Sequence, residues 1–333
     1  MIMKVWFLIF TLFSFGAFGI SEQNFQESYQ LFVLPEFKTF QQSHFLNSAG
    51  IKINYYFKIS KNAKKTLVIL PGRTEPAKKY AELLYDLKNE EVNFFVMDHQ
   101  GQGESDHLLS DTQKGHVEKF ENYIEDFAYF MEEIVLKNTK DTEHMFLAHS
   151  MGSLVGIGFM QKNPKIFSKA VLNSPMLGIN TFPLSNGIMK RLTSRQISKG
   201  IEHSYSTFTK PYNPFFPFWL NPNTSSWARF EKSKELFMAD PSIIVGGPTV
   251  RWLDESLRAS REIRNSDAYI PTSILILKGG RDIVVRTKLH NDFCFNQQDC
   301  RIYRYPKARH EVLFEQDGIR SMAINSVKNF LDI

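Results

Sequence analysis

The sequence predicts an α/β fold with a mostly parallel sheet covered by helices on both faces. Short apolar runs alternate with helix-length segments along the 333 residues. These runs are continuous rather than alternating in polarity, which is typical of strands buried on both faces. The charged fraction of 23% is ordinary for a globular chain and argues against bulk disorder. The length allows one large domain or two medium ones.

The expected elements follow each other in a regular order. Residues 45–57 form two strand-like halves broken by the turn at 47–50, which predicts an edge hairpin. Further strands are expected at 66–70, 92–97, 145–148, 170–172, 273–277 and 301–305. Helices are expected at 76–89, 117–137, 152–162 and 318–330. The polar stretch 21–27 is expected to be irregular. Residues 28–176 and 270–333 are thus predicted to form an α/β core in two parts.

Residues 177–269 differ in composition and are predicted to be an insertion between two strands. Its stretch 208–222 mixes four prolines with several aromatic residues, and the segment contains helical patterns at 188–199 and 248–264. An insertion over the carboxyl ends of the strands, where open α/β sheets bind ligands, can act as a cap or lid. The alternative is a set of extra helices on a core of their own. Candidate substrate contacts in the segment are Phe215, Phe216, Phe218 and Trp219.

The first nineteen residues predict a signal peptide. Lys4 precedes an apolar run at 5–18, and the small residues Ala17 and Gly19 suit cleavage after Gly19. The alternative is an uncleaved anchor, although the run is shorter than the roughly 20 residues of a membrane span. We therefore expect an exported protein, periplasmic or membrane-associated.

Two cysteines, Cys294 and Cys300, are the only ones in the chain. In an exported protein they are expected to form a small-loop disulfide, and two free thiols are the alternative. No histidine pair lies near them in sequence, so they do not predict a zinc site. We expect neither a metal nor a cofactor.

The overall charge gives no reason to expect a nucleic-acid partner. The chain has 40 basic and 35 acidic residues, a net charge of +5, and no dense basic run. Its 30 phenylalanines are unusual. They fit either a Phe-rich core or an apolar substrate and a membrane surface.

Residues 148–152, Ala-His-Ser-Met-Gly, are the strongest motif for chemistry. They join an apolar strand to a helix of small residues. A nucleophile elbow needs this context, because its serine stands on a sharp strand-to-helix turn with small neighbours. Ala148 replaces the commoner glycine and weakens the match without breaking it. The motif makes Ser150 the candidate nucleophile.

A serine nucleophile needs a histidine base that is oriented by an acid. Asp282 follows the strand at 273–277, and His310 follows the strand at 301–305, each through a short loop. In this fold the chain order is serine, acid, histidine. Each residue alone has an ordinary explanation as a turn or surface residue, but the three together fall at strand ends in the required order. They predict a Ser150, Asp282 and His310 triad.

Acyl transfer also requires an oxyanion hole of two fixed backbone N–H groups. One is expected from Met151 after the nucleophile, and the other from Arg73 in the loop after the strand at 66–70. Gly72 would let the backbone approach closely. The glycine-spaced loop at 98–105 lacks the dinucleotide-binding pattern and is expected to be a structural loop beside the site.

With these motifs together, the chain resembles the monoglyceride-lipase-like α/β-hydrolases, the serine-aminopeptidase-type group, and most closely their bacterial lysophospholipases. The matching segments are 72–83, 98–103, 115–123, 148–152, 173–176, 279–285 and 308–315. The resemblance implies an acyl-ester hydrolase with Ser150, Asp282 and His310 as its triad. Departures are Ala148, Pro71 where the group often has histidine, and the export-type N-terminus, which puts cytoplasmic residence in doubt.

The hypothesis for the substrate is a lysophospholipid, with peripheral contact to a membrane. Residues 181–220 carry five basic residues, Lys190, Arg191, Arg195, Lys199 and Lys210, against one acid, Glu202. Cations near an apolar slot suit a phosphate headgroup, although a solvated basic helix face explains them equally well. Monoacylglycerol or general carboxylester hydrolysis is the alternative activity. A non-catalytic lipid- or partner-binding relative is the alternative class.

Overall fold

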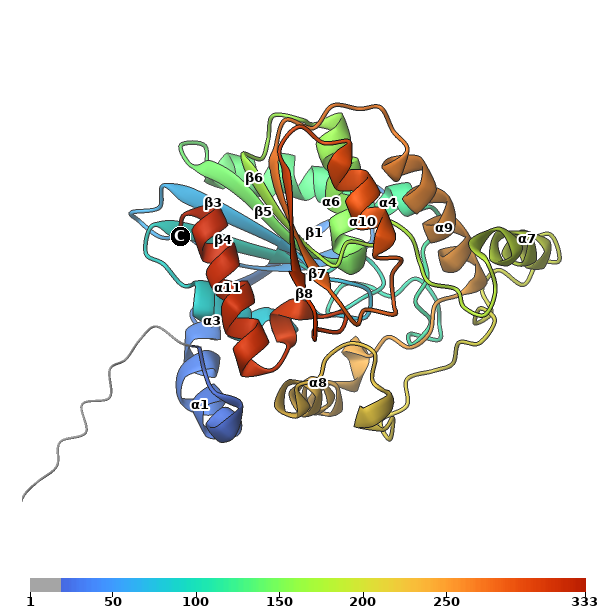
Figure 1. Cartoon of the computed structure of the whole chain (residues 1–333), viewed down its shortest axis with the longest axis horizontal. Helices are drawn as coiled ribbons and strands as arrows, with labels where there is room; N and C mark the ends of the chain where they lie inside the picture. The colour runs from blue at the N-terminus through green and yellow to red at the C-terminus, as the bar shows by residue number, and fades with distance from the viewer. Residues whose placement is uncertain (1–18) are drawn as a thin grey trace, which may run out of the picture.

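A central sheet of eight strands organises the computed structural model, which describes residues 19–333 (Figure 1). The strand order is β1-β2-β4-β3-β5-β6-β7-β8, and only β2 runs antiparallel to its neighbours. The strands are β1 Gln41–Leu46, β2 Lys52–Lys58, β3 Lys65–Leu70, β4 Val92–Met97, β5 Glu143–His149, β6 Lys169–Asn173, β7 Ser273–Gly279 and β8 Cys300–Tyr305. The predicted α/β fold with a mostly parallel sheet is confirmed.

Helices cover both faces of this sheet. One face packs against α4, α6, α9 and α10, and the other packs against α3 and α11. The α-helices are α1 Phe25–Ser28, α2 Leu34–Phe37, α3 Ala81–Leu87, α4 Phe120–Tyr129, α5 Leu136–Asn138, α6 Ser150–Lys162, α7 Asn186–Ile197, α8 Trp227–Ala239, α9 Val250–Arg264, α10 Lys288–Phe295 and α11 Asp317–Leu331. Shorter 3-10 or π turns are η1 Glu22–Asn24, η2 Tyr29–Val33, η3 Ala77–Tyr80, η4 Phe130–Val135, η5 Phe218–Leu220, η6 Pro241–Ile243 and η7 Val312–Phe314. The two apolar faces of the central strands explain their continuous hydrophobic runs.

The expectation of an irregular segment at 21–27 is wrong. Residues from Glu22 to Phe37 are helical, through η1, α1, η2 and α2. The cause lies in the apolar positions Phe25, Tyr29 and Val33, which repeat every four residues and pack together beside α3. The Ser21 side chain accepts a hydrogen bond from the Gln23 N–H at the start of this segment. Polar residues between these positions hid the pattern.

The segment between β6 and β7, residues 174–272, carries α7, α8 and α9 (Figure 1). We call it the β6–β7 insertion. Helix α9 packs against α7, α4 and α6 and so joins the insertion to the core. Helices α7 and α9 match the predicted patterns, whereas α8 was not predicted.

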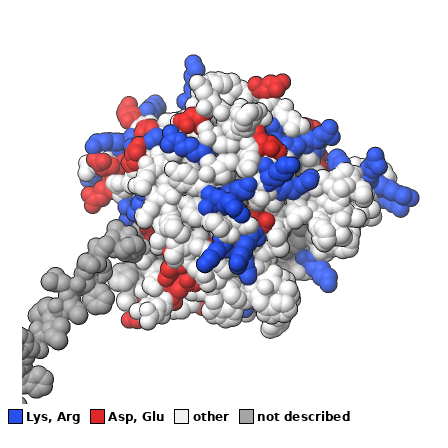
Figure 2. Space-filling model, in the orientation of Figure 1, with Lys and Arg blue, Asp and Glu red and all other residues white. Residues whose placement is uncertain are grey.

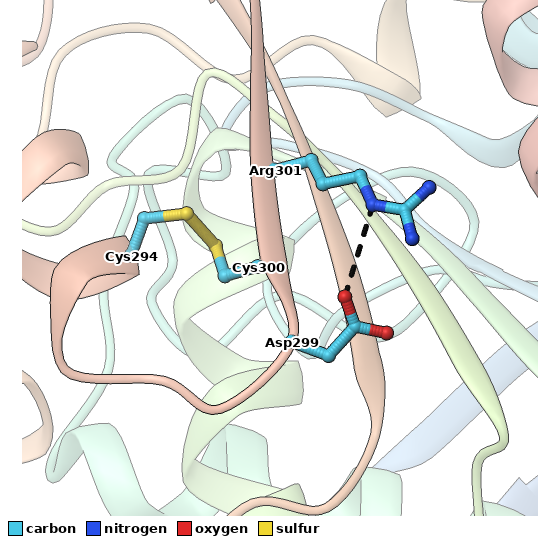
Figure 3. The surroundings of a disulfide bond; sticks show 4 residues. All are labelled: Cys294, Asp299, Cys300 and Arg301. Carbon is cyan, nitrogen blue, oxygen red and sulfur yellow. Dashed lines mark ion pairs between the residues drawn. A yellow bond between two sulfur atoms is a disulfide. The ribbon is translucent and has the colours of Figure 1, made fainter.

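A disulfide joins Cys294 at the end of α10 to Cys300 at the start of β8 (Figure 3). The predicted pairing is confirmed. The predicted signal peptide lies outside the described residues except for Gly19. Within residues 19–333, no helix has the length and apolar character needed to cross a membrane.

Candidate active site

Ser150 stands on the turn between β5 and α6 with a left-handed backbone, φ +49°. That conformation is costly for a residue with a side chain, and it is typical of functional turns. Gly152 lets the elbow pack closely on the loop after β3, because a Cβ there would lie 2.4 Å from the Pro71 carbonyl oxygen. Ala148 is fully buried and its methyl group is accommodated. The geometry is that of the predicted elbow.

Asp282 and His310 come from the loops after β7 and β8, which are parallel neighbours. The two loops pack closely, because a Cβ on Gly279 would lie 2.0 Å from the Arg309 carbonyl oxygen. The Arg281 N–H donates to the Ala308 carbonyl at 2.8 Å. The carboxyl ends of β5, β7 and β8 therefore bring all three predicted residues to one edge of the sheet.

The three side chains form a continuous hydrogen-bonded chain. His310 Nε2 lies 2.9 Å from Ser150 Oγ, and His310 Nδ1 lies 2.7 Å from Asp282 Oδ2. Asp282 Oδ1 accepts from the N–H groups of Val284 and Val285. Burial alone would raise the pKa of Asp282, but His310 and these N–H groups bring it below its ordinary value. An ionised Asp282 holds the His310 ring with Nε2 toward Ser150.

His149 lies beside this chain without joining it. Its ring centre is 4.6 Å from that of His310, and its Nδ1 lies 2.9 Å from Asn173 Nδ2. Burial lowers the pKa of His149 to about 4, so the ring is neutral near pH 7. His310, rather than His149, is the histidine that contacts the Ser150 hydroxyl.

The loop that carries Arg73 is held rigidly against the elbow. Gly72 donates its N–H to Glu75 Oε2 at 2.6 Å, and Thr74 (φ +68°) donates its N–H to Gln102 Oε1 at 3.0 Å. The Gln102 amide in turn donates to the Gly72 carbonyl. Within residues 19–333, neither the Arg73 N–H nor the Met151 N–H donates to another group of the chain. The loop at 98–105 thus acts as the expected support beside the site.

A buried lysine links this loop to the histidine loop. Lys79 Nζ lies 2.6 Å from Glu75 Oε1 and 2.8 Å from Glu311 Oε2. Burial alone would raise the pKa of Glu75, but Lys79 and other contacts bring it to about 2. Burial raises the pKa of Glu311, the second carboxylate on the same lysine. The ion pairs fix the spacing between the loop of Arg73 and the loop of His310.

A cavity of about 350 Å³ opens above Ser150. Its walls combine core and insertion residues, and most of its surface is apolar. The apolar lining includes Met176, Ile179, Phe182, Met189, Phe208, Trp252, Leu253, Val284 and Val285. A second cavity of about 560 Å³ shares part of this lining and continues toward α8. Together they form a two-part space, which we call the first and second cavities.

The prediction that Phe215, Phe218 and Trp219 line the site is wrong for this structure. Phe215 and Trp219 are 88% and 74% exposed, and Phe218 packs against Trp227 and Phe230. Phe216 lines the second cavity only. The aromatic side chains beside Ser150 are Phe182, Phe208 and Trp252.

These site aromatics lie in parts of the insertion that give no local signal. Trp252 shows in the sequence only as one apolar position of a helical pattern, and Phe208 stands in a loop with φ +69°. Four of the five basic residues at 181–220 also lie away from both cavities, and Lys210 alone lines the second. Tertiary packing, rather than local composition, selects the side chains that face Ser150.

Residues 61–317 match the family model described as serine aminopeptidase, S33. The chain belongs to this family. It is 32% identical to lysophospholipase L2 of Escherichia coli over 275 residues, covering 80% of each chain. It is 29% identical to probable lysophospholipase L2 of Haemophilus influenzae, covering 90% of this chain and 95% of that one. The mouse (Mus musculus) monoglyceride lipase is 24% identical over 70% of each. The resemblance stated from the motifs is confirmed.

Solved structures of lipases and esterases share the fold of this chain. A soluble variant of monoglyceride lipase from Saccharomyces cerevisiae, in complex with a substrate analog, superposes with a TM-score of 0.68 at 18% identity, covering 88% of this chain and 96% of that one. A carboxyl esterase from Bacillus coagulans gives 0.70 at 16% identity, covering 88% and 98%. The S33 family member described here therefore has the α/β-hydrolase fold.

Proposed function

We propose that this chain hydrolyses the single acyl ester of a lysophospholipid, with Ser150 as nucleophile. The chain is a carboxylic-ester hydrolase of the S33 family. The observation that carries the proposal is the hydrogen-bonded chain from Asp282 through His310 to Ser150, which opens into a largely apolar cavity. An apolar cavity of this kind can hold an acyl chain and place its ester carbon next to the Ser150 hydroxyl.

The reaction proceeds through an acyl-enzyme. Ser150 Oγ attacks the ester carbon while His310 Nε2 takes the hydroxyl proton. The carbonyl oxygen gains negative charge and accepts from the N–H groups of Arg73 and Met151. When the glycerol oxygen leaves, it takes the proton from His310. Water then attacks the acyl-enzyme, gives its proton to His310, and releases the fatty acid as Ser150 recovers its hydrogen.

In this proposal residues 177–269 of the β6–β7 insertion act as the cap over the site. Phe182, Phe208 and Trp252 of the insertion meet Ser150 and His310 around one cavity. The insertion also binds the histidine loop directly, since the Glu311 N–H donates to the Asn223 carbonyl at 2.7 Å. Movement of the cap would open or close access for a lipid.

The outer surface of the insertion supports peripheral contact with a membrane. More than half of the exposed large hydrophobic side chains of the described residues lie in this segment. They are Phe182, Ile188, Ile201, Phe208, Phe215, Phe216, Trp219, Leu220, Trp227, Met238 and Tyr269. Figure 2 shows lysine and arginine side chains gathered on the face where β7, β8 and α10 lie. Exposed aromatics beside cations suit an anionic lipid surface.

We also propose that the chain is exported through cleavage after Gly19. The disulfide between Cys294 and Cys300 supports this, because such bonds persist in oxidising compartments. N-terminal sequencing of the protein recovered from cells tests the point. A terminus at Ile20 is expected, and an intact Met1 would contradict cleavage.

Monoacylglycerol hydrolysis is the second candidate, because a neutral glycerol headgroup would fit the same apolar cavity. A substrate panel of purified protein separates the candidates: lysophosphatidylcholine, a monoacylglycerol and a short-chain chromogenic ester. We expect the highest kcat/KM with the lysophospholipid. Preference for the monoacylglycerol would overturn the substrate proposal, and no turnover of any ester would overturn the enzymatic one.

A further inference from the structure

The Arg73 side chain lies at the junction of the two cavities. It lines both of them, and it is the only lysine or arginine among the described residues around the first cavity. Its guanidinium carbon lies 5.3 Å from the centre of the Trp252 ring, in the first cavity wall. Its Nη1 donates to the Gly246 carbonyl at 2.7 Å, in the second cavity wall. These contacts fix the guanidinium between the two spaces.

Arg73 is half-buried and, unlike the buried arginines Arg229 and Arg320, has no acidic partner among the described residues. Arg229 binds Glu82 and Asp317, and Arg320 pairs with Glu82 and Asp86. Within residues 19–333, no carboxylate lies within ion-pair distance of Arg73. The nearest acid in sequence, Glu75, is already engaged by Gly72, Lys79 and Tyr80. Burying a cation without a partner is costly.

The unpaired guanidinium keeps donors available to a ligand. An arginine has several N–H donors, and the hydrogen bond to Gly246 is the single one that the Arg73 side chain makes among the described residues. Its other guanidinium nitrogens are not enclosed by protein atoms, and the residue lines both cavities. Burial lowers the pKa of Arg73 to about 10, which still leaves it charged near neutral pH. A half-buried cation with open donors and no acidic partner can accept an anionic ligand.

We propose that the Arg73 guanidinium binds the phosphate of the lysophospholipid and so selects it over a neutral monoacylglycerol. The inference rests on the proposed function and adds a residue that determines which lipid headgroup the enzyme prefers. Planar N–H pairs of arginine suit phosphate oxygens. The substrate phosphate would then be the anionic partner of Arg73 that no carboxylate of the described residues provides.

The backbone and the side chain of Arg73 correspond to two separate groups of the substrate, the ester and the phosphate. Its backbone N–H is placed to hold the ester oxyanion, and its side chain extends from the same residue toward the second cavity. In a lysophospholipid the glycerol unit likewise separates the ester from the phosphate. The rest of the headgroup then extends into the second cavity, where Lys210 and Tyr212 contribute to the lining.

The test compares selectivity in Arg73→Gln, Arg73→Lys and a control, Arg301→Gln. Arg301 is exposed on β8 and faces only Asp299, at 3.8 Å (Figure 3). The readout is the ratio of kcat/KM for lysophosphatidylcholine to kcat/KM for the monoacylglycerol with the same acyl chain. We expect Arg73→Gln to lower this ratio by roughly 10- to 100-fold, the effect of one lost charge-assisted hydrogen-bond set. Arg73→Lys should keep part of the wild-type preference for lysophosphatidylcholine, and Arg301→Gln should keep all of it.

A second readout distinguishes headgroup binding from a purely structural role. Glycerol 3-phosphate should inhibit hydrolysis of the short-chain ester by the wild type, and at least tenfold more weakly in Arg73→Gln, whereas glycerol should inhibit neither. Equal losses on both lipids with unchanged inhibition would overturn the proposal and leave Arg73 as a support for the Gly246 loop. Failure of the wild type to hydrolyse lysophosphatidylcholine would instead overturn the proposed function.

Discussion

His310 Nε2 lies 2.9 Å from Ser150 Oγ, although 160 positions separate the two residues in the chain. Parallel strands bring them together, because β5 and β8 end at the same edge of the sheet. The contact depends on how closely the elbow, the Arg73 loop and the histidine loop pack. Each of these packing relationships makes a prediction.

Gly152→Ala is expected to lower kcat by roughly 100- to 1000-fold, the range for loss of an oxyanion donor. The added methyl would lie 2.4 Å from the Pro71 carbonyl oxygen, so the elbow and the Arg73 loop must separate. The matched control is Gly187→Ala on α7, whose methyl would meet nothing nearer than Ser185 Oγ at 4.0 Å. The control should keep full activity and gain slightly in helix stability. Equal activity in both variants would contradict the close packing.

Buried neutral histidines predict a loss of stability in acid. Burial lowers the pKa of His99, His149 and His290 to about 4. Between pH 6.5 and pH 4 the unfolded chain therefore binds protons that the folded chain does not, so the free energy of unfolding falls as pH falls. Each such group contributes about 1.4 kcal/mol per pH unit.

The variant His290→Gln tests this effect, because glutamine can still donate to the Pro175 carbonyl that His290 contacts. Chemical denaturation at pH 7 and pH 5 should show a smaller loss of stability in the variant than in the wild type. His44→Gln, on the exposed strand β1, is the control and should behave like the wild type. An unchanged pH dependence in His290→Gln would show that this ring is not held neutral.

Removal of the disulfide should destabilise the chain without affecting the chemistry. The Cys294–Cys300 bond closes a short loop, for which the chain-entropy estimate is about 2 kcal/mol. The double variant Cys294→Ser with Cys300→Ser should unfold at a lower denaturant concentration and keep its kcat. A reducing agent should lower the stability of the wild type and leave that of the double variant unchanged. Sensitivity of the double variant to reduction would contradict the assignment.

Exposed aromatics of the insertion are expected to strengthen binding to lipid vesicles. Phe215→Ser combined with Trp219→Ser should weaken binding to anionic vesicles by roughly tenfold or more, since large apolar side chains are lost from the contact. Hydrolysis of a soluble short-chain ester should not change, because neither residue lines a cavity. Ile59→Ser, 46% exposed just after β2 and outside the insertion, is the control. Vesicle binding that falls equally in the control would remove the insertion as the membrane-facing surface.

The sequence predicted the core well because its signals are local. Continuous apolar runs mark the strands, and the small residues around Ser150 mark the elbow. Asp282 and His310 could then be assigned from their places after predicted strands and from their order in the chain. The disulfide followed from two closely spaced cysteines. Residues near the N-terminus were missed because the apolar spacing of Phe25, Tyr29 and Val33 is interrupted by polar residues.

The lining of the site could not be predicted in the same way. Phe215 and Phe208 have similar sequence surroundings and are both largely exposed, but only Phe208 lines the cavity above Ser150. The unpaired state of Arg73 is also a tertiary property, since it depends on where Gly246, Trp252 and the acids of other elements lie. When packing between distant segments decides which side chains line a site, local composition does not predict them.

The most direct test of the account is covalent modification by a fluorophosphonate ester, read by peptide mass spectrometry. We predict labelling of Ser150 alone, abolished in Ser150→Ala and slowed by at least about a thousandfold in His310→Ala. A double variant that combines Ser150→Ala with His310→Ala should hydrolyse lipid esters no more slowly than either single variant, because the two residues act as one unit. Labelling of a different serine, or full ester hydrolysis by Ser150→Ala, would contradict the central claim.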